Sequence, residues 1–448
     1  MSRSLDLTQG SIPGSMLRFA LPMMAGNLLQ QCYNIADTMV VGRFLGPNAL
    51  AAVGSAFTLM TFLTSVLLGL CMGSGAVFSM RYGAKDAEGL CRSIAHAFWM
   101  IALAALLLNL GSFALLRPIL RLLQVPGPVY PLIKEYLEII FWGILATFLY
   151  NFFACLLRAV GNSAVPLAFL ACSAVGNLVL DLWFVLGLGW GVRGAAAATV
   201  LAQWAAAAGI AAYTLARFAQ LRPARRHWRW NRRTAAALGA ASVLTSLQQS
   251  VMNFGILMVQ GLVNSFGPAV MAAFAAAVKI DSFAYMPMQD FGNAFSTFIA
   301  QNHGAGKSER IRQGVRSAVT VAAAAGCTVS ALVCALAPQL LAIFVGGEET
   351  EILAIGARYL RIEGLFYWGI GLLFLLYGYY RAIERPGMSL VLTIVSLGTR
   401  VALAYALAPL PAFGVTAIWA AVPIGWVLAD AVGFGYYAWL RKKADRAV

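Results

Sequence analysis

Four polar side chains lie within long apolar stretches in the first half of the 448-residue sequence: Asp37, Asn177, Asp181 and Thr199. An ionisable side chain at membrane depth costs free energy, so each one is a functional-site hypothesis. Asn177 and Asp181 are four residues apart and therefore share one face of a helix. Two carboxyl groups, an amide and a hydroxyl offer oxygen ligands to Na⁺, and burial favours a carboxyl group that keeps its proton. The set predicts a site that binds H⁺ or Na⁺; the alternative is that Asp37 pairs locally with Arg43.

The second half carries a different set of polar residues in its apolar stretches. Lys279 and Arg400 are expected to neutralise Asp281 and Asp290 in a structural network, and the alternative is that these charges bind substrate or ion. The candidate residues of a substrate cavity are Gln30, Gln31, Gln248, Gln249, Lys279, Asp281, Tyr285, Met286, Asp290 and Arg400. Two further carboxyl groups, Glu363 and Asp430, are expected to be satisfied by their neighbours.

Composition places the chain in a membrane. Hydrophobic residues make up 61% of the sequence and charged residues 11%, whereas about a quarter of the residues in a soluble domain are charged. Apolar stretches long enough to cross about 30 Å of hydrocarbon as a helix recur along the whole chain. The expected spans are residues 15–42, 49–78, 90–116, 131–157, 164–187, 192–217, 234–264, 269–298, 312–344, 355–381, 388–408 and 413–440. The expected fold class is therefore all-α, with twelve transmembrane helices.

Two prolines fall inside these spans. Pro22 lies in the first span and Pro287 in the eighth, between Asp281 and Asp290. A proline inside a helix removes one backbone hydrogen bond and bends the helix. Both positions are therefore predicted to bend, and Pro22 would let the first span move near Asp37.

The chain repeats itself after roughly 220 residues. Leu29-Gln30-Gln31 returns as Leu247-Gln248-Gln249, Gly46-Pro47 as Gly267-Pro268, and Tyr136-Leu137 as Tyr359-Leu360. Six spans per copy make the two copies parallel in topology, and duplicated membrane bundles typically enclose a transport path. We expect a six-helix lobe over 1–216, a basic linker over 217–233 and a second six-helix lobe over 234–448, in a monomeric protein embedded in a lipid bilayer.

The charge distribution gives the expected orientation. Most of the 32 Lys and Arg residues fall on the side that holds both termini and the linker, so this side is predicted to be cytoplasmic. Trp228 and Trp230 within the basic linker are interpreted as residues at the lipid headgroups, with no nucleic acid as partner. Residues 304–308 resemble the end of a phosphate-binding loop, but Gln301 stands where that motif needs a glycine. The segment is therefore predicted to be a helix-ending turn, and nothing in the sequence suggests ATP hydrolysis or a bound cofactor.

Several segments resemble one known family. They are FALPMMAGNLLQQCYNIADTMVVGRFLGPNALAAVG (19–54), RYGAKD (81–86), QNHGAGKSER (301–310) and RAVGNSAVP (158–166). Together they resemble the multidrug and toxic compound extrusion (MATE) family of bacterial membrane transporters, over the whole chain. The resemblance implies two pseudo-symmetric lobes in a V-shaped arrangement and a location in the bacterial inner membrane. In type and spacing, Asp37, Asn177, Asp181 and Thr199 are similar to the ion-linked cluster of the DinF-like branch, whereas the seventh span lacks the carboxylate that other branches use.

The resemblance implies a transport activity and no enzymatic reaction. The expected function is a secondary antiporter that exports amphipathic, cationic organic compounds in exchange for H⁺ or Na⁺ by alternating access. A flippase for lipid-linked precursors in the same superfamily is the main alternative, which Lys279 and Arg400 keep open. A passive channel would not need the acidic cluster, and a membrane-embedded enzyme would need a catalytic constellation that the three separated histidines do not provide.

Overall fold

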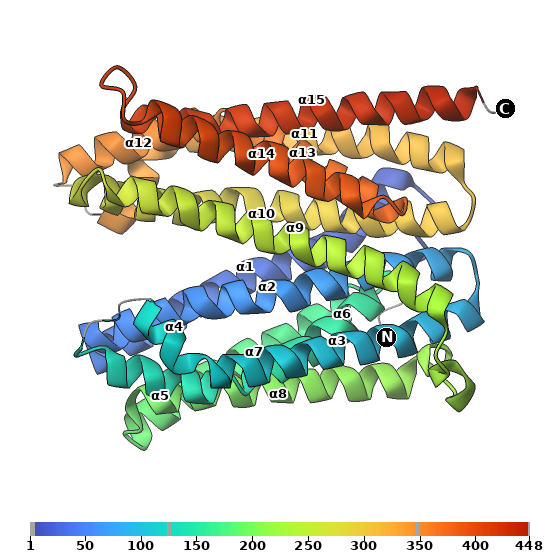
Figure 1. Ribbon diagram of the computed structural model, residues 1–448, viewed down its shortest axis with the longest axis horizontal. Coiled ribbons are helices and arrows are strands. Elements are labelled where there is room, and N and C mark those ends of the chain that lie inside the picture. The colour runs from blue at the N-terminus through green and yellow to red at the C-terminus, as the bar shows by residue number, and fades with distance from the viewer. Residues whose placement is uncertain (1–4, 123–124, 126, 346–348, 447–448) are drawn as a thin grey trace. The chain divides into compact units, whose positions relative to one another are not determined.

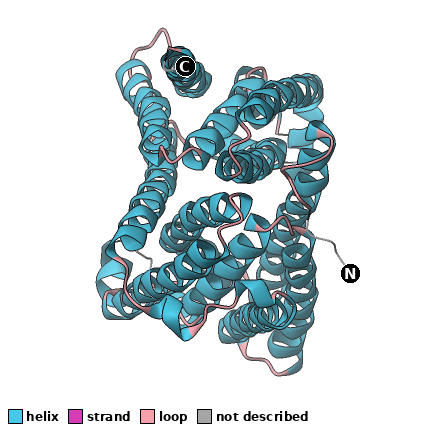
Figure 2. Cartoon of the chain, turned by 90° about the vertical axis from the view of Figure 1, so that its right-hand side faces the viewer, coloured by secondary structure: helices cyan, strands magenta, loops and turns pink. Residues whose placement is uncertain are grey.

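The computed structural model describes residues 5–122, 125, 127–345 and 349–446, and these residues form helices and loops without any strand (Figures 1 and 2). The first repeat contains α1 (Ile12–Leu45), α2 (Pro47–Gly83), α3 (Ala87–Ala114), α4 (Leu116–Leu122), α5 (Tyr130–Ile140), α6 (Gly143–Ala159), α7 (Ala164–Asp181), the π-helix η1 (Leu182–Gly187) and α8 (Gly191–Arg217). Two short 3₁₀ helices follow, η2 (Ala219–Leu221) and η3 (Arg225–Trp228). The second repeat contains α9 (Arg232–Asn264), α10 (Pro268–Gly304), α11 (Ser308–Val345), α12 (Thr350–Gly364), α13 (Tyr367–Ala382), α14 (Pro386–Leu407) and α15 (Val415–Asp445).

Each predicted span coincides with one of these helices or with a pair of them. In the described residues, eight helices are long and apolar enough to cross a membrane, and two bent pairs bring the number to ten. The remaining two predicted spans are α1 and α9, which have 34 and 33 residues and are long enough but more polar. The polar residues of these two helices include the repeated Gln-Gln pair and, in α1, Asp37, which are all candidate site residues.

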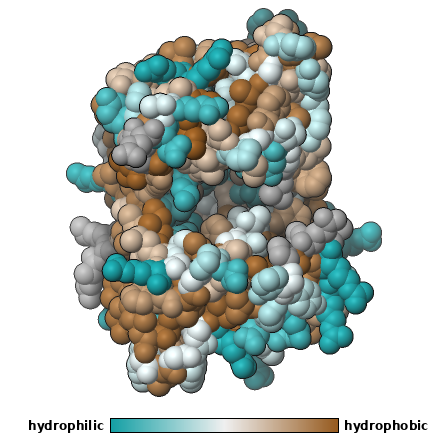
Figure 3. All heavy atoms as spheres, turned by 90° about the vertical axis from the view of Figure 1, so that its left-hand side faces the viewer, coloured by the Kyte–Doolittle hydropathy of each residue, from teal (hydrophilic) through white to brown (hydrophobic). Residues whose placement is uncertain are grey.

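Large apolar side chains on the helix surfaces fit a lipid environment. On α3, for example, Leu103, Leu107 and Leu110 are each more than half exposed. Side chains of this kind facing outward are expected where the surrounding solvent is hydrocarbon. Hydrophilic side chains, by contrast, are scattered among hydrophobic ones over the end of the helices that Figure 3 faces.

Two predicted spans are broken near their middle. α5 and α6 meet at an angle of 44°, and α12 and α13 meet at 50°. The breaks lie at equivalent places in the two repeats, shortly after Tyr136-Leu137 and Tyr359-Leu360. A break at membrane depth frees backbone groups that need partners. In the first repeat, Asn109 Nδ2 donates to Phe141 O at 2.6 Å and Trp204 Nε1 donates to Trp142 O at 3.2 Å.

Contacts divide the chain into two compact units. Unit 1 comprises residues 1–6 and 21–246, and unit 2 comprises residues 7–20 and 247–448. The division falls inside α1 and α9, so each of these helices belongs partly to one unit and partly to the other. In α1 the division lies between Ala20 and Leu21, one residue before Pro22, and Pro22 lies inside a continuous helix as Pro287 does in α10. The bends at the two prolines and the predicted lobe boundaries at 216 and 234 stay predictions.

Unit 1 is held together by a close approach of α2 to the first half of α9. Gly69 and Gly73 on α2 face the backbone of α9 around Ser242 and Ser246. The hydroxyls of Ser74 and Ser242 lie 2.8 Å apart and form a hydrogen bond, and Ser246 Oγ donates to Val66 O at 3.0 Å. Small residues at such spacing let two helices approach without a hydrophobic driving force, as membrane interfaces require.

A glycine immediately precedes the second helix of each repeat. Gly46 and Gly267 have φ of 86° and 98°, and each immediately precedes the proline that starts α2 or α10. A positive φ is readily adopted only by glycine, and proline at the first helical position lacks an amide hydrogen that would have no partner. The repeated Gly-Pro pair therefore sets the entry to both helices.

The segment that resembles a phosphate-binding loop is a helix end, as the sequence predicts. α10 ends at Gly304, and the N–H of Ala305 donates to Gln301 O at 3.0 Å. The Lys307 ammonium donates to Thr8 O at 2.8 Å within unit 2. Asn302 Nδ2 also donates to Leu7 O at 3.1 Å. Lys307 thus holds the N-terminal segment of the chain.

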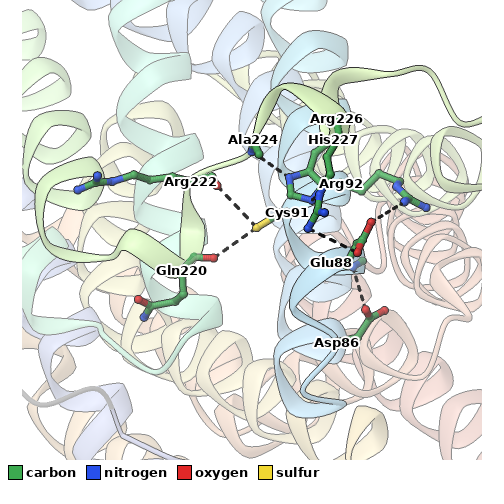
Figure 4. Close-up of polar contacts among 10 residues, drawn as sticks. Asp86, Glu88, Cys91, Arg92, Gln220, Arg222, Ala224, Arg226 and His227 are labelled. Carbon is green, nitrogen blue, oxygen red and sulfur yellow. Dashed lines mark hydrogen bonds and ion pairs between the residues drawn. The ribbon is translucent and has the colours of Figure 1, made fainter.

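The basic linker lies against α3 (Figure 4). Cys91 Sγ donates to Gln220 O at 3.3 Å, and Arg226 lies 3.8 Å from Glu88. His227 is buried, and its Nδ1 accepts from Ala224 N at 2.9 Å. Trp230 is 71% exposed at the start of α9, where a headgroup-level tryptophan is expected. The linker is therefore an ordered segment of unit 1, with its tryptophans at the surface.

Candidate functional site

The four residues predicted from the first repeat come together inside unit 1. Asp37 lies on α1, Asn177 and Asp181 lie on α7, and Thr199 lies on α8. Asn177 is 1% exposed and Asp181 is completely buried. Asp181 ends α7, and the wider turns of the π-helix η1 begin at the next residue. Single π-helical turns inside longer helices are often found at functional sites.

Asn177 connects the other members of the cluster. When its amide is oriented to satisfy its neighbours, the nitrogen donates to Asp181 Oδ2 at 2.8 Å and to Tyr33 Oη at 3.1 Å. The amide oxygen then accepts from the backbone N–H of Thr199 at 3.0 Å. The Thr199 hydroxyl donates to Ala195 O at 3.0 Å and lies 3.4 Å from the same amide. One buried amide thus fixes the positions of a carboxyl group, a phenol and α8.

The two carboxyl groups of the cluster face each other. Asp37 and Asp181 lie within hydrogen-bond reach of one another, and each also keeps one buried oxygen, Oδ1, without a hydrogen-bond partner. Two carboxylates in contact repel, so such a pair is stable when one proton lies between them. Among the described residues, no ion pair joins either Asp to a Lys or Arg, and the local pairing of Asp37 with Arg43 is not observed. The pair therefore has room for one exchangeable cation.

Two tyrosines that the sequence analysis did not select complete the cluster. Tyr33 lies one helical turn before Asp37 and interacts with Thr199 and with both carboxyl groups. Tyr136, on α5 before the break, is buried near Asp37, Asp181 and Tyr33. The spacing of Tyr33 from Asp37 was a usable signal, because residues four apart share a helical face. A second usable signal was that Tyr136 recurs in the other repeat as Tyr359.

Unit 2 buries a second carboxyl cluster. Tyr359 Oη donates to Asp281 Oδ2 at 2.8 Å, and the Tyr367 hydroxyl donates to Asp281 Oδ1. Glu363 lies within hydrogen-bond reach of Asp281, and Arg400 interacts electrostatically with both carboxyl groups. Glu363 was expected to be satisfied by its neighbours, and this holds in part: it interacts with Asp281 and with Tyr359 one turn earlier, whereas its Oε2 has no hydrogen-bond partner.

The other candidate residues of the second repeat are spread over several environments. Lys279 is exposed and lies over the Phe344 ring at 5.8 Å, and none of the ion pairs among the described residues joins it to Asp281 or Asp290. The expected neutralisation by Lys279 is therefore not observed, because its side chain extends away from the cluster, whereas Arg400 remains near it. Buried residues among the others are Gln248, Gln249 and Asp290. Partly buried or exposed ones are Gln30, Gln31, Tyr285 and Met286, and Tyr285 packs on Phe374.

The unit 2 cluster supports a test of its structural role. Replacing Tyr359 by Phe removes a donor to a fully buried carboxyl group, and an unsatisfied buried polar group costs about 1–3 kcal/mol. We expect a lower thermal unfolding temperature in detergent. Tyr405→Phe is the matched control. Tyr405 also donates a hydrogen bond, to Met258 O at 3.2 Å, but it is about half exposed, so its loss should cost less. Equal stability of the Tyr359→Phe and wild-type proteins would show that this hydrogen bond does not stabilise unit 2.

No group of three or more His, Cys, Asp or Glu side chains in the described part of the chain is arranged to hold a metal ion. A sodium ion at the unit 1 cluster would therefore rely on two carboxyl groups together with the oxygens of Asn177, Thr199 and Tyr33. A proton needs only the two carboxyl groups. The cluster therefore needs fewer ligand groups to bind a proton than to bind a metal cation.

The fold and this site define a class of protein: an all-helical, multi-pass membrane protein with two neighbouring carboxyl groups inside unit 1. The family model described as MatE matches residues 22–183 and 241–406. Two relatives of Bacillus subtilis (strain 168) are named as probable multidrug resistance proteins. YpnP is 30% identical over 396 residues, 88% of each chain, and YoeA is 28% identical over 455 residues, 98% of this chain and 96% of the relative.

The solved structures agree on the fold. One described as the outward-facing conformation of a multidrug resistance MATE family transporter of the MOP superfamily has a TM-score of 0.92, covers 99% of both chains and is 24% identical. The chain belongs to the MatE family of membrane transporters. The expected all-α, multi-pass fold and the resemblance to this family are confirmed.

Proposed function

We propose that this transporter exports amphipathic, cationic organic compounds in exchange for H⁺ by alternating access, and that it belongs to the DinF-like branch of the family. The two relatives named as probable multidrug resistance proteins support the substrate class. The composition of the unit 1 cluster supports the branch. α9, by contrast, has no Asp or Glu that would support a coupling site in the seventh span.

The single observation that carries this proposal is the contact between Asp37 and Asp181. Asp181 is buried and Asp37 is partly buried, and two such carboxyl groups within hydrogen-bond reach are stable when a proton lies between them. Loss of that proton leaves two negative charges that a cation or a rearrangement must compensate. Binding and release of one proton therefore change the local structure at the junction of α1 and α7. Na⁺ as the coupling ion is the alternative.

The proposed cycle uses these residues in turn. On the outer side a proton binds the Asp37–Asp181 pair, Asn177 and Tyr33 keep the protonated pair in place, and α1 bends at Pro22 as substrate leaves. The transporter then opens to the cytoplasm, the pair loses its proton, and a new substrate binds. Both termini are proposed to be cytoplasmic, since the basic residues favour that side. The protein is proposed to act as a monomer in the inner membrane, without a cofactor or nucleic acid.

The coupling ion is tested in proteoliposomes loaded with a fluorescent organic cation. An imposed proton gradient should drive substrate uptake against its gradient, and substrate should drive proton movement when Na⁺ is absent. A sodium gradient at equal pH on both sides should drive nothing above the protein-free control. Uptake driven by sodium and accompanied by radioactive sodium flux would overturn proton coupling. Uptake that never exceeds equilibrium would favour a passive channel.

The flippase alternative makes a different prediction. A lipid-linked precursor carries phosphate groups, so its transport would depend on cationic side chains rather than on the carboxyl pair. Arg400 interacts with Asp281 and Glu363, and Lys279 lies over an aromatic ring. Replacement of Lys279 by Gln should leave export of organic cations unchanged. Loss of lipid translocation in that variant would support the flippase instead.

A further inference from the structure

Asp430 lies near the middle of α15, inside unit 2, and takes no part in the two clusters described above. Asp430 is 6% exposed, and neither its Oδ1 nor its Oδ2 has a hydrogen-bond partner. A buried polar group without a partner is rare in folded proteins and indicates a bound water, an ion or a functional role. An ionisable group at membrane depth has the same implication. The expectation that neighbours satisfy Asp430 is therefore wrong, because no donor among the described residues of the surrounding helices reaches either of its oxygens.

The carboxyl group of Asp430 lies beside the first turn of α13, which follows the break between α12 and α13. Gly369, the third residue of α13, lies beside it: a Cβ placed on Gly369 would be 3.7 Å from Asp430 Oδ2 and 3.8 Å from Trp426 Cβ. These are ordinary contact distances, so a methyl group fits there without displacing a neighbour. Because residue 369 is a glycine, no side chain at this position lies against Asp430 Oδ2, and a water molecule can approach the carboxyl group from this side. The N–H of Gly369 itself donates to Phe366 O at 2.8 Å, so the polar group that would hold this water is the carboxyl group of Asp430.

In the first repeat, the carbonyl groups freed by the broken helix have hydrogen-bond partners. Its break is between α5 and α6, where Asn109 and Trp204 donate to the freed carbonyl groups of Phe141 and Trp142. Trp204 on α8 has its repeat counterpart in Trp426 on α15, and at the position of Asp430 the first repeat has Ala208. One repeat therefore places side-chain donors at its break, and the other places a carboxyl group without a partner.

Other charged and titratable groups around Asp430 are engaged elsewhere. The phenol of Tyr377, on α13, interacts electrostatically with Asp430, but its hydrogen-bond partner is Thr393 of α14. From α14, Arg400 acts on Asp281 and Glu363, and Glu363 itself, from α12, pairs with Asp281. A hard metal cation requires about six oxygen ligands, which this surrounding does not offer. A neutral carboxyl group that carries a proton matches the apolar environment.

We propose that Asp430 is a further proton-binding site of this protein, which exchanges its proton with a water molecule admitted at the break between α12 and α13. The site is separate from the Asp37–Asp181 pair and does not require that pair to function. Protonated Asp430 donates to the water, and the water donates onward to solvent or to a second water. The space beside Gly369 is the entry.

The experiment uses infrared spectroscopy of the full-length protein in lipid, in a background where Asp37 and Asp181 are both replaced by Asn. The C=O stretching band of protonated carboxyl groups is recorded in H₂O and after transfer to D₂O. We expect one component of this band to disappear in Asp430→Asn, and the same component to shift in D₂O when Asp430 is present. Gly369→Ala keeps the carboxyl group but fills the space with a methyl group, and should slow that shift at least tenfold.

Each outcome decides the matter. A band unchanged by Asp430→Asn would show that the group does not hold a proton, and a component that never responds to D₂O would show that it exchanges none. An equal rate of exchange in Gly369→Ala and in its parent would overturn the entry, and this variant remains informative if Asp430→Asn fails to fold. The band is independent of transport, so failure of the proposed antiport at Asp37 leaves the result interpretable.

Discussion

Asp37→Asn should abolish coupled transport while the protein still inserts into the membrane. The substitution keeps the size and polarity of the side chain but removes the carboxyl group that is proposed to share a proton with Asp181. One charge moved through about 100 mV supplies roughly 2.3 kcal/mol, enough for an approximately fifty-fold gradient of a neutral substrate. The variant should therefore accumulate no gradient in proteoliposomes energised by a proton gradient.

Asp181→Asn should give the same result, because each carboxyl group needs the other to bind the exchangeable proton. Asp86→Asn is the matched control. Asp86 is a partly exposed carboxyl group that caps α3 by accepting from Gly89 N at 2.8 Å, and Asn caps helices equally well. Its transport should match wild type. Normal substrate-driven proton flux in Asp37→Asn would refute the assignment of the coupling site.

Residue types and helical spacing predicted the core of this cluster. Asn177 and Asp181 share a helical face whatever the rest of the fold does, and the high cost of a carboxyl group in hydrocarbon made Asp37 a candidate. Their approach to one another was not predictable from spacing, since it depends on how α1, α7 and α8 pack. The role of Asn177 as the hub also depends on that packing, because its three partners come from all three of these helices.

The same limit explains what the sequence analysis missed. Tyr136 and Tyr359 were recognised as a repeated pair but only as evidence of duplication, and their hydroxyl groups emerged as site members only once the broken spans were seen. The breaks themselves fall within continuous apolar runs that satisfy the length of a span. Lys279 was expected to neutralise Asp281, but residues two apart on a helix point in different directions, and the ammonium group lies over the Phe344 ring.

Gly73→Val should strongly destabilise unit 1. A Cβ at this position would lie 2.5 Å from Ala241 O and 2.6 Å from Ser242 Cα, which are backbone atoms of α9 that cannot rotate away. Valine adds two further methyl groups at the same place. Overpacking of this kind typically costs about 1–3 kcal/mol, and the upper end applies where the obstacle is backbone. We expect a reduced thermal unfolding temperature in detergent and a lower yield of folded protein.

Gly54→Val, on the same helix, provides the comparison. Gly54 is exposed, and no atom lies within 4 Å of a Cβ placed there, so its substitution should change the unfolding temperature little. Gly73→Val forces α2 and the first half of α9 apart and separates Ser74 from Ser242, which are hydrogen-bonded at 2.8 Å. Ser242→Ala should therefore cost less than Gly73→Val, because it removes the hydrogen bond without adding volume. If Gly73→Val and Gly54→Val were equally stable, the close approach of α2 and α9 would not be what holds this part of unit 1 together.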